Sequence, residues 1–278
     1  MLLYSIEVLE VVVVQYINVF MNDQPKTIAM KNAVTPYLED RGYIISRVFR
    51  EDAKFNFVIG GDGTFLRAVR ESGFSTIPFV GINTGHLGFF QEIDAVNYIE
   101  YLDLLLKEEY TVDSLQLLSA KIETSSWSYD LNVVNEFFVS TVDFHLLQML
   151  LDFDGVRIID QSADGLIVST PAGSTAYNLS ADGAILYQTL EGFQVTTVSP
   201  IQSKRYTSLP SSIVVPSHSV LQLHINPDDA ERIRVMADGV ERQFKGVKSI
   251  IFCSTDKYIK RVAFTKNWYW HNLKDKFL

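Results

Sequence analysis

The chain has 278 residues, and a length above the usual single domain of roughly 100 to 200 residues predicts one large domain or two coupled ones. Hydrophobic residues make up 47% of the chain and charged residues 21%, which supplies enough apolar surface for a sizeable core and excludes global disorder. The net charge of −9 argues against a nucleic-acid partner, because the phosphates of long nucleic acids attract basic proteins. A single cysteine, Cys253, excludes an intramolecular disulfide and a zinc site built from several thiolates, and it fits a reducing compartment.

The N-terminal stretch is apolar from residue 1 to residue 20, but Glu7, Glu10, Gln15 and Asn18 interrupt it. A membrane span needs about 20 mostly uncharged residues, and a signal peptide needs a basic start and a small-residue cleavage site. Neither pattern is present. We therefore expect an extension over residues 1–15 ahead of a buried strand, no membrane segment, and a cytoplasmic protein.

Strand-like and helical segments alternate over residues 16–110. The helical patterns cover 27–41 and 64–70, and the strand-like runs are 17–21, 44–49, 55–59 and 78–82. Asp94 is placed to cap a third helix, whose expected buried stripe is Val96, Ile99, Leu102, Leu105 and Leu106. The alternation predicts an α/β domain with a mostly parallel sheet.

The pattern changes after residue 110. Strand-like runs with alternating apolar residues follow one another through residue 258, and Asp154-Gly155 and Asp238-Gly239 stand between such runs, where they suit hairpin turns. We therefore expect a β-rich, largely antiparallel second domain over residues 111–258. The tail, residues 259–278, is expected to pack back on the first domain.

The strongest chemical signal is a glycine-rich turn, Gly60-Gly61-Asp62-Gly63-Thr64, between a strand-like run and a helical segment. Glycines allow backbone N–H groups to turn toward an anion, and a helix N-terminus favours negative charge, so the turn predicts a phosphate site. A plain Asp-Gly turn is the alternative, since the chain has five Asp-Gly pairs. A carboxylate inside a phosphate-binding turn is unfavourable unless it binds Mg²⁺ or accepts a proton from a nucleophile, which makes Asp62 a candidate general base.

A second glycine-bearing turn, residues 83–89, also follows a strand-like run. Because ligands gather at the carboxyl ends of parallel strands, this turn is expected to form the opposite wall of the same cleft. His86 within it is a candidate donor to phosphate, with a structural or solvated histidine as the alternative. Cations near these segments in the sequence are expected to be solvated surface charges, namely Arg67, Arg70, Lys204 and Arg205.

Two further polar segments lie in the β-rich part. Asn135 and Glu136 place an amide beside a carboxylate, a pair that can hydrogen-bond ribose hydroxyls or an adenine edge. In the polar stretch 164–180, Ser174 is expected to cap a helix through Ser180 that presents Tyr177 and Ser180 on one face. An ordinary capped helix with a satisfied tyrosine is the alternative.

Other reaction classes are disfavoured because their motifs are missing. No Gly-Lys dipeptide occurs, which excludes a Walker A loop, and Leu66 replaces the third glycine of GxGxxG. No serine stands in GxSxG, and no two histidines have the HxxxH spacing. P-loop, dehydrogenase, serine-hydrolase and zinc-peptidase mechanisms therefore find no support.

Taken in this order, the four segments resemble the NAD kinase family, whose hallmarks are GGDGT, N-x-G-x-L-G-F, an Asn-Glu pair and D-G-x-x-x-S-T-P-x-G-S-T-A-Y. Diacylglycerol and sphingosine kinases carry a similar GGDGT loop, whereas the stretch 164–180 singles out NAD kinases. The resemblance implies a fold like that of NAD and diacylglycerol kinases. It also implies transfer of the ATP γ-phosphoryl group to the 2′-hydroxyl of the adenosine ribose of NAD, giving NADP, with a divalent ion such as Mg²⁺.

The same resemblance implies roles for individual residues. Asp62 matches the catalytic base, with Gly61 and Gly63 beside the phosphates. Thr64 and His86 are expected on the phosphate side from their places in the two glycine turns. The implied NAD contacts are Phe89, Asn135, Glu136, Asp164, Thr175, Ala176, Tyr177 and Ser180. In this family the contact matching Asp164 is made across a subunit boundary on the nicotinamide side, which implies a homodimer or homotetramer. Ala163 and Asp182 stand where the family usually has glycine, so the turn before Asp164 is expected to differ.

Two alternatives remain beside this interpretation. A lipid kinase shares the GGDGT loop, but it lacks support from residues 164–180, and the acidic chain suits an anionic membrane poorly. A non-catalytic NAD(P)-binding regulator has no need of a carboxylate facing phosphates, so Asp62 argues against it. The sequence leaves open whether ATP or polyphosphate is the donor, and whether NAD or NADH is preferred.

Overall fold

The computed structural model describes residues 14–143, 145–201 and 207–278. Nearly all of the expected N-terminal extension lies outside these residues, as do Lys204 and Arg205. The chain divides into two compact units. Unit 1 contains the chain up to Thr111 together with Val262–Leu278, and unit 2 contains Val112–Arg261. Within the described part, no helix is both long and apolar enough to cross a membrane.

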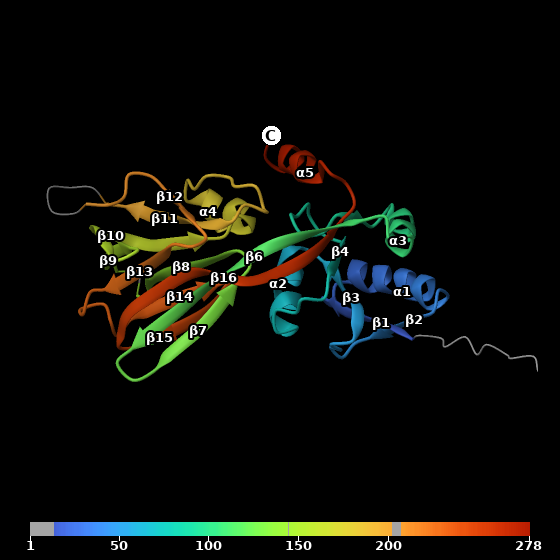
Figure 1. The fold of residues 1–278 in the computed structure, drawn as a ribbon, viewed down its shortest axis with the longest axis horizontal. Coiled ribbons are helices and arrows are strands. Elements are labelled where there is room, and N and C mark those ends of the chain that lie inside the picture. Colours follow the sequence, from blue (N-terminus) through green and yellow to red (C-terminus); the bar gives the residue numbers. More distant parts are fainter. Residues whose placement is uncertain (1–13, 144, 202–206) are drawn as a thin grey trace, which may run out of the picture. The chain divides into compact units, whose positions relative to one another are not determined.

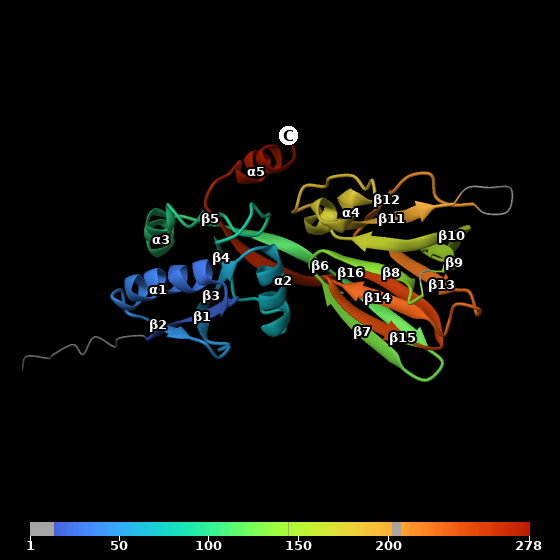
Figure 2. The same ribbon diagram turned by 180° about the vertical axis from the view of Figure 1, so that it is seen from behind.

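Unit 1 contains a parallel sheet in the order β2-β1-β3-β4-β5 (Figure 1; β5 is labelled in Figure 2). Its strands are β1 (Gln15–Met21), β2 (Tyr43–Ser46), β3 (Ala53–Gly60), β4 (Phe79–Asn83) and β5 (Ile93–Asp94). The register places Met21 opposite Ile59 and Gly60 opposite Asn83, so β1, β3 and β4 end at the same edge of the sheet. The turns that follow these three strands therefore meet there.

Helices cover both faces of this sheet. α1 (Pro25–Glu39) and α3 (Tyr98–Leu106) share one buried cluster with the strands, to which α1 contributes Met30, Val34 and Leu38 at helical spacing. α2 (Asp62–Glu71) buries a separate set, Phe65, Ala68 and Val69, and the ring of Phe65 lies 4.6 Å from that of Phe90 in a stacked arrangement. The last helix of the chain, α5 (Trp268–Phe277), also belongs to unit 1.

The stripe predicted for the third helix is wrong at its start. Val96 is 85% exposed and precedes α3, and Ile99 is 48% exposed, whereas Leu102 and Leu105 are buried as expected. The reason lies in Asp94, whose Oδ1 accepts hydrogen bonds from the backbone N–H groups of Val96 and Asn97 at 2.7 and 2.8 Å. This turn occupies the residues before Tyr98 and delays the helix.

Unit 2 is built from antiparallel strands, with the path β15-β14-β8-β10-β9-β13-β16 (Figure 2). β11 and β12 pair beside β10, and β6 and β7 pair beside β16. The strands are β6 (Thr111–Thr124), β7 (Ser128–Val133), β8 (Glu136–Thr141), β9 (Leu147–Phe153), β10 (Val156–Ser169), β11 (Gly192–Pro200), β12 (Ile213–Pro216), β13 (Val220–Ile225), β14 (Ile233–Ala237), β15 (Val240–Phe244) and β16 (Val247–Ala263). The expected α/β part and β-rich part are both confirmed.

The two Asp-Gly hairpins are confirmed as well. Asp154 and Gly155 join β9 to β10 with φ angles of 53° and 83°, and Asp238 and Gly239 join β14 to β15 with φ angles of 47° and 77°. A two-residue turn with positive φ at both positions matches the twist of the flanking strands, and aspartate followed by glycine tolerates it well. The local sequence therefore fixes both turns.

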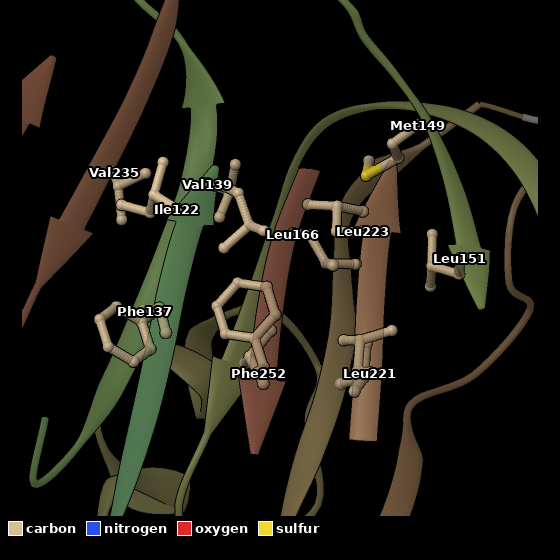
Figure 3. Close-up of a cluster of buried hydrophobic side chains, with 14 of the residues drawn as sticks. Ile122, Phe137, Val139, Met149, Leu151, Leu166, Leu221, Leu223, Val235 and Phe252 are labelled. Carbon is tan, nitrogen blue, oxygen red and sulfur yellow. The ribbon is translucent and has the colours of Figure 1, made fainter. Parts of the chain in front are cut away.

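The strands of unit 2 enclose one large hydrophobic core (Figure 3). Phe137 on β8 and Phe252 on β16 are both fully buried, and their ring centres lie 5.6 Å apart. Replacing such a ring by alanine costs about 3 to 5 kcal/mol. This core fixes β8 and β10, which carry the polar segments of unit 2.

Candidate functional site

The glycine-rich turn of unit 1 lies where the strand order reverses. The chain leaves β1 through α1 toward β2 on one side, and leaves β3 through α2 toward β4 on the other. In α/β sheets, ligands bind at such a reversal, beyond the carboxyl ends of the two central strands. Gly60 ends β3, and Gly61 is the N-cap of α2. A Cβ at Gly60 would overlap the Thr64 side chain, so this turn requires glycine.

A cavity of about 890 Å³ opens at this edge of unit 1. Its lining includes Gly61, Gly63, Thr64 and His86, four residues that the sequence assigned to phosphate. The described residues that line it include Lys26 and Arg67 and no carboxylate. Although the whole chain is acidic, the cavity is suited to an anion.

Asp62 is the first residue of α2, and the turn after β4 fixes its carboxylate. The Phe89 N–H donates to both carboxylate oxygens at 3.0 Å, and the Phe90 N–H donates to Oδ1 at 3.2 Å. A Cβ at Gly88 would overlap this carboxylate, so only glycine permits the approach. The Asp62 side chain is 28% exposed, which leaves part of the held carboxylate accessible.

Phe89 itself is 3% exposed. Its ring lies 5.8 Å from that of Tyr269 and 5.9 Å from that of Phe277, both on α5. The two glycine turns of unit 1 therefore meet at Asp62, and α5 packs against the second of them.

In unit 2, Asn135 and Glu136 lie at the start of β8. The carboxylate of Asp238, in the β14–β15 turn, accepts the N–H groups of Val134 at 2.8 Å and Asn135 at 2.7 Å. Among the described residues, the buried Oδ1 of Asn135 and Oε2 of Glu136 have no hydrogen-bond partner. Buried polar atoms without partners are costly, so this pair is suited to bind a polar ligand.

Burial raises the pKa of Glu136 to about 8, and the nearby negative charge of Asp238 adds to this effect. A backbone hydrogen bond from Tyr177 works in the opposite direction. Near pH 7 the Glu136 carboxyl is therefore mostly protonated, and it can both donate and accept hydrogen bonds. That property suits a ligand with hydroxyl groups.

A second, smaller cavity of about 370 Å³ lies in unit 2 and brings Asp164 and Tyr177 together. The Tyr177 ring meets Phe138 edge-on, with centroids 5.3 Å apart, and Arg234 also lines the cavity. Ala163 and Asp164 lie inside β10, so the expected turn before Asp164 does not exist. The reason is that Ala163 pairs with both Leu147 and Pro200, which keeps the backbone extended.

The helix predicted from Ser174 to Ser180 is wrong in detail. The segment forms a short 3-10 helix, Ala172–Thr175, and one turn of α-helix, α4 (Tyr177–Ser180), separated at Ala176. Ser174 does not cap a helix because its hydroxyl donates to the Pro171 carbonyl at 2.7 Å and accepts from the Leu186 N–H at 2.9 Å. The expected NAD contacts of this segment still lie on two consecutive helical turns, namely Thr175, Ala176, Tyr177 and Ser180.

The large cavity has five further polar lining residues, namely Asn22, Gln24, Lys26, Arg67 and Thr84. Only Arg67 among them is named in the sequence analysis. Arg67 had been expected to be solvated, but its Nη2 donates to the Met21 carbonyl at 2.6 Å. Asn22 donates to the Thr64 hydroxyl at 3.2 Å. Asn22 directly follows β1, so the rule that ligands bind beyond strand ends offered a signal for it.

A parallel α/β sheet with a cavity and a helix N-terminus at its point of reversal is typical of nucleotide-binding proteins. A model of the ATP-NAD kinase N-terminal domain matches residues 3–110, and a model of the ATP-NAD kinase C-terminal domain matches residues 136–262. This chain belongs to the ATP-NAD kinase family.

Individual relatives agree with the family models. The chain is 45% identical over 266 residues to an NAD kinase of Finegoldia magna, covering 94% of this chain and 97% of that protein. It is 28% identical over 257 residues to an NAD kinase of Staphylococcus aureus, covering 91% and 94%.

Two solved structures share the fold. The yeast NADH kinase in complex with NADH has a TM-score of 0.83 at 20% identity, covering 95% of this chain and 87% of that one. The NAD kinase of Archaeoglobus fulgidus in complex with ATP has a TM-score of 0.74 at 24% identity, covering 94% and 98%. The expected fold class is thereby confirmed.

Proposed function

We propose that this protein is an NAD kinase, which transfers the γ-phosphoryl group of ATP to the 2′-hydroxyl of the adenosine ribose of NAD and releases NADP and ADP. The observation that carries the proposal is the placement of Asp62. Its carboxylate is held by two backbone N–H groups, and the residues on either side of it, Gly61 and Gly63, line the anion-suited cavity. Membership of the ATP-NAD kinase family supports the choice of substrates.

The ATP phosphates occupy the cavity at the glycine-rich turn. Gly61, Gly63 and Thr64 line this cavity at the first turn of α2, where the helix dipole favours negative charge. Lys26 and Arg67 supply positive charge, and His86 is a further donor. Phosphoryl transfer depends on alignment and charge neutralisation more than on covalent help, and these groups provide both.

Asp62 acts as the general base. Its carboxylate accepts the proton of the ribose 2′-hydroxyl while the oxygen forms a bond to the γ-phosphorus, and the bond from that phosphorus to the bridging oxygen of ADP breaks. The Phe89 and Phe90 N–H groups keep the carboxylate in one orientation and leave its exposed edge for the hydroxyl.

NAD binds through residues of unit 2, with Asn135 and Glu136 on the ribose or adenine and with Asp164, Thr175, Ala176, Tyr177 and Ser180 as further contacts. The partnerless Asn135 Oδ1 and Glu136 Oε2 support this assignment. Phe89 belongs to the same proposal as the aromatic residue beside the adenosine half. The Phe89 ring is buried and packs against Tyr269 and Phe277 of α5, so its side chain is 3% exposed before any ligand binds.

The remaining assignments extend this proposal. Among the described residues, no three or more His, Cys, Asp or Glu side chains are grouped to hold a metal ion, and Mg²⁺ in such sites is typically carried by substrate phosphates and water. Bound Mg²⁺ neutralises charge on the transferred phosphoryl group.

We further propose that the protein is a cytoplasmic homodimer or homotetramer, in which Asp164 reaches the nicotinamide side of NAD in a partner subunit. The proposed phosphoryl donor is ATP rather than polyphosphate.

The test is NADP formation by the pure protein from NAD, ATP and Mg²⁺. Asp62→Asn is expected to lower kcat by roughly 10² to 10⁴-fold, as general-base loss does, while the Kd for NAD stays within about twofold. Asp40→Asn, at the exposed C-terminal end of α1, is the matched control and should keep full activity. No NADP from the unchanged protein over a range of pH and metal would refute the function, and a collapse of NAD binding in Asp62→Asn would refute the role of Asp62.

A further inference from the structure

The C-terminal helix α5 makes an extensive contact with the turn that holds Asp62. Asn272 is 3% exposed, and its Nδ2 donates to the Gly88 carbonyl. Tyr269 and Phe277 pack against the Phe89 ring. Gly88 and Phe89 are therefore held in place by α5. The last turn of this helix lies close to the Asp62 carboxylate.

Lys276 reaches Asp62 from that last turn. Its Nζ lies 4.0 Å from Asp62 Oδ2 and 4.7 Å from the centre of the Phe89 ring. The Lys276 side chain is 30% exposed and the Asp62 side chain 28%, so both charges are shielded from bulk water over most of their surface. At this distance two opposite charges attract, and the attraction is stronger than it is between fully exposed groups.

An anion in the cavity next to residue 62 would repel the Asp62 carboxylate, and the positive charge of Lys276 can offset this repulsion. The residues on either side of Asp62, Gly61 and Gly63, line the cavity that is suited to an anion. A polyphosphate in that cavity repels the carboxylate and favours its rotation away or its protonation. The Phe89 and Phe90 N–H groups hold the carboxylate but carry no net charge.

We propose that Lys276 is a positioning residue of the phosphoryl-transfer site: its ammonium group keeps the Asp62 carboxylate ionised and oriented while an anionic phosphoryl donor occupies the neighbouring cavity. The inference rests on the proposed function, because it takes Asp62 as the general base. Lys276 acts through Asp62 and needs no contact with either substrate.

A double-mutant cycle on kcat tests this role. Lys276→Met is expected to lower kcat roughly two- to fivefold with the KM values for NAD and ATP nearly unchanged, which corresponds to the loss of one partly exposed ion pair in the transition state. In protein that already carries Asp62→Asn, Lys276→Met should change the residual kcat by less than about 1.5-fold, because a residue that acts through a carboxylate has no effect once that carboxylate is neutral. Lys276→Arg, which keeps the charge, should recover most of the lost activity.

Lys274→Met is the matched control, since Lys274 is an exposed lysine on the same helix. Its kcat should equal that of the unchanged protein, and the melting temperatures of all variants should agree within about 2 °C. An equal loss from Lys276→Met in both backgrounds would overturn the inference, because it would indicate a direct or purely structural role, and so would the absence of any loss. Failure of the proposed function gives a different result, since the unchanged protein itself would then form no NADP.

Discussion

The protonation of Glu136 makes a quantitative prediction about stability. The pKa of this carboxyl is about 8 in the folded protein, against 4.5 when it is unperturbed. Between these two values the folded state holds a proton that the unfolded chain has released. The contribution of Glu136 to stability is therefore fully present below pH 4.5, and it is lost progressively as pH rises toward 8.

Glu136→Gln removes this dependence, because glutamine is neutral at every pH and has nearly the same shape. Each pH unit well inside the window corresponds to about 1.4 kcal/mol, and the slope flattens near pH 8, so between pH 5.5 and 7.5 the wild-type protein should lose about 2.5 kcal/mol of unfolding free energy relative to Glu136→Gln. Urea unfolding followed by circular dichroism at several pH values gives this difference directly.

Glu241→Gln serves as the control, since Glu241 is an exposed glutamate on β15, the strand next to β14. Its unfolding free energy should follow that of the wild-type protein at every pH. A constant difference between wild type and Glu136→Gln from pH 5.5 to 7.5 would show that Glu136 is ionised in the folded protein, and the burial argument would then be refuted.

Two further predictions concern the shape of the proposed sites. Gly88→Ala places a methyl group against the Asp62 carboxylate and should lower kcat at least tenfold in the NADP assay, since small displacements of a catalytic group are expensive. Tyr177→Ala removes the ring that packs on Phe138 and should raise the Kd for NAD by roughly three- to tenfold in calorimetric titrations. Tyr129→Ala, which removes an equally exposed ring packed on Phe244, should leave the Kd unchanged; equal Kd values for both tyrosine variants would place NAD elsewhere.

Local chemistry in the sequence was sufficient to predict much of the fold. The parallel strands of unit 1 follow from short apolar runs between glycine turns, and both Asp-Gly hairpins follow from the φ angles that these residues tolerate. The prediction failed where a side chain forms a hydrogen bond with a different group from the one expected. Asp94 closes a turn before α3, and the Ser174 hydroxyl bonds Pro171 and Leu186 in place of a helix cap.

The candidate site depends more on contacts between distant parts of the chain. The sequence singled out Asp62 and Glu136 as residue types in suggestive places, but the donors to Asp62 come from Phe89 and Phe90, and the charge that helps raise the pKa of Glu136 comes from Asp238. No periodicity or spacing reveals such pairs. The family resemblance assigns expected roles to these residues, and the structure shows the contacts on which tests of those roles can be based.

The division of the chain also bears on how the protein is made. Val262–Leu278 completes unit 1, whereas unit 2 is one continuous segment. During synthesis the N-terminal part of unit 1 must wait for the last residues before Asn272 can reach Gly88, so unit 2 is able to finish folding first. A change that displaces α5 is therefore expected to disturb the turn that holds Asp62, although the two segments are far apart in the sequence.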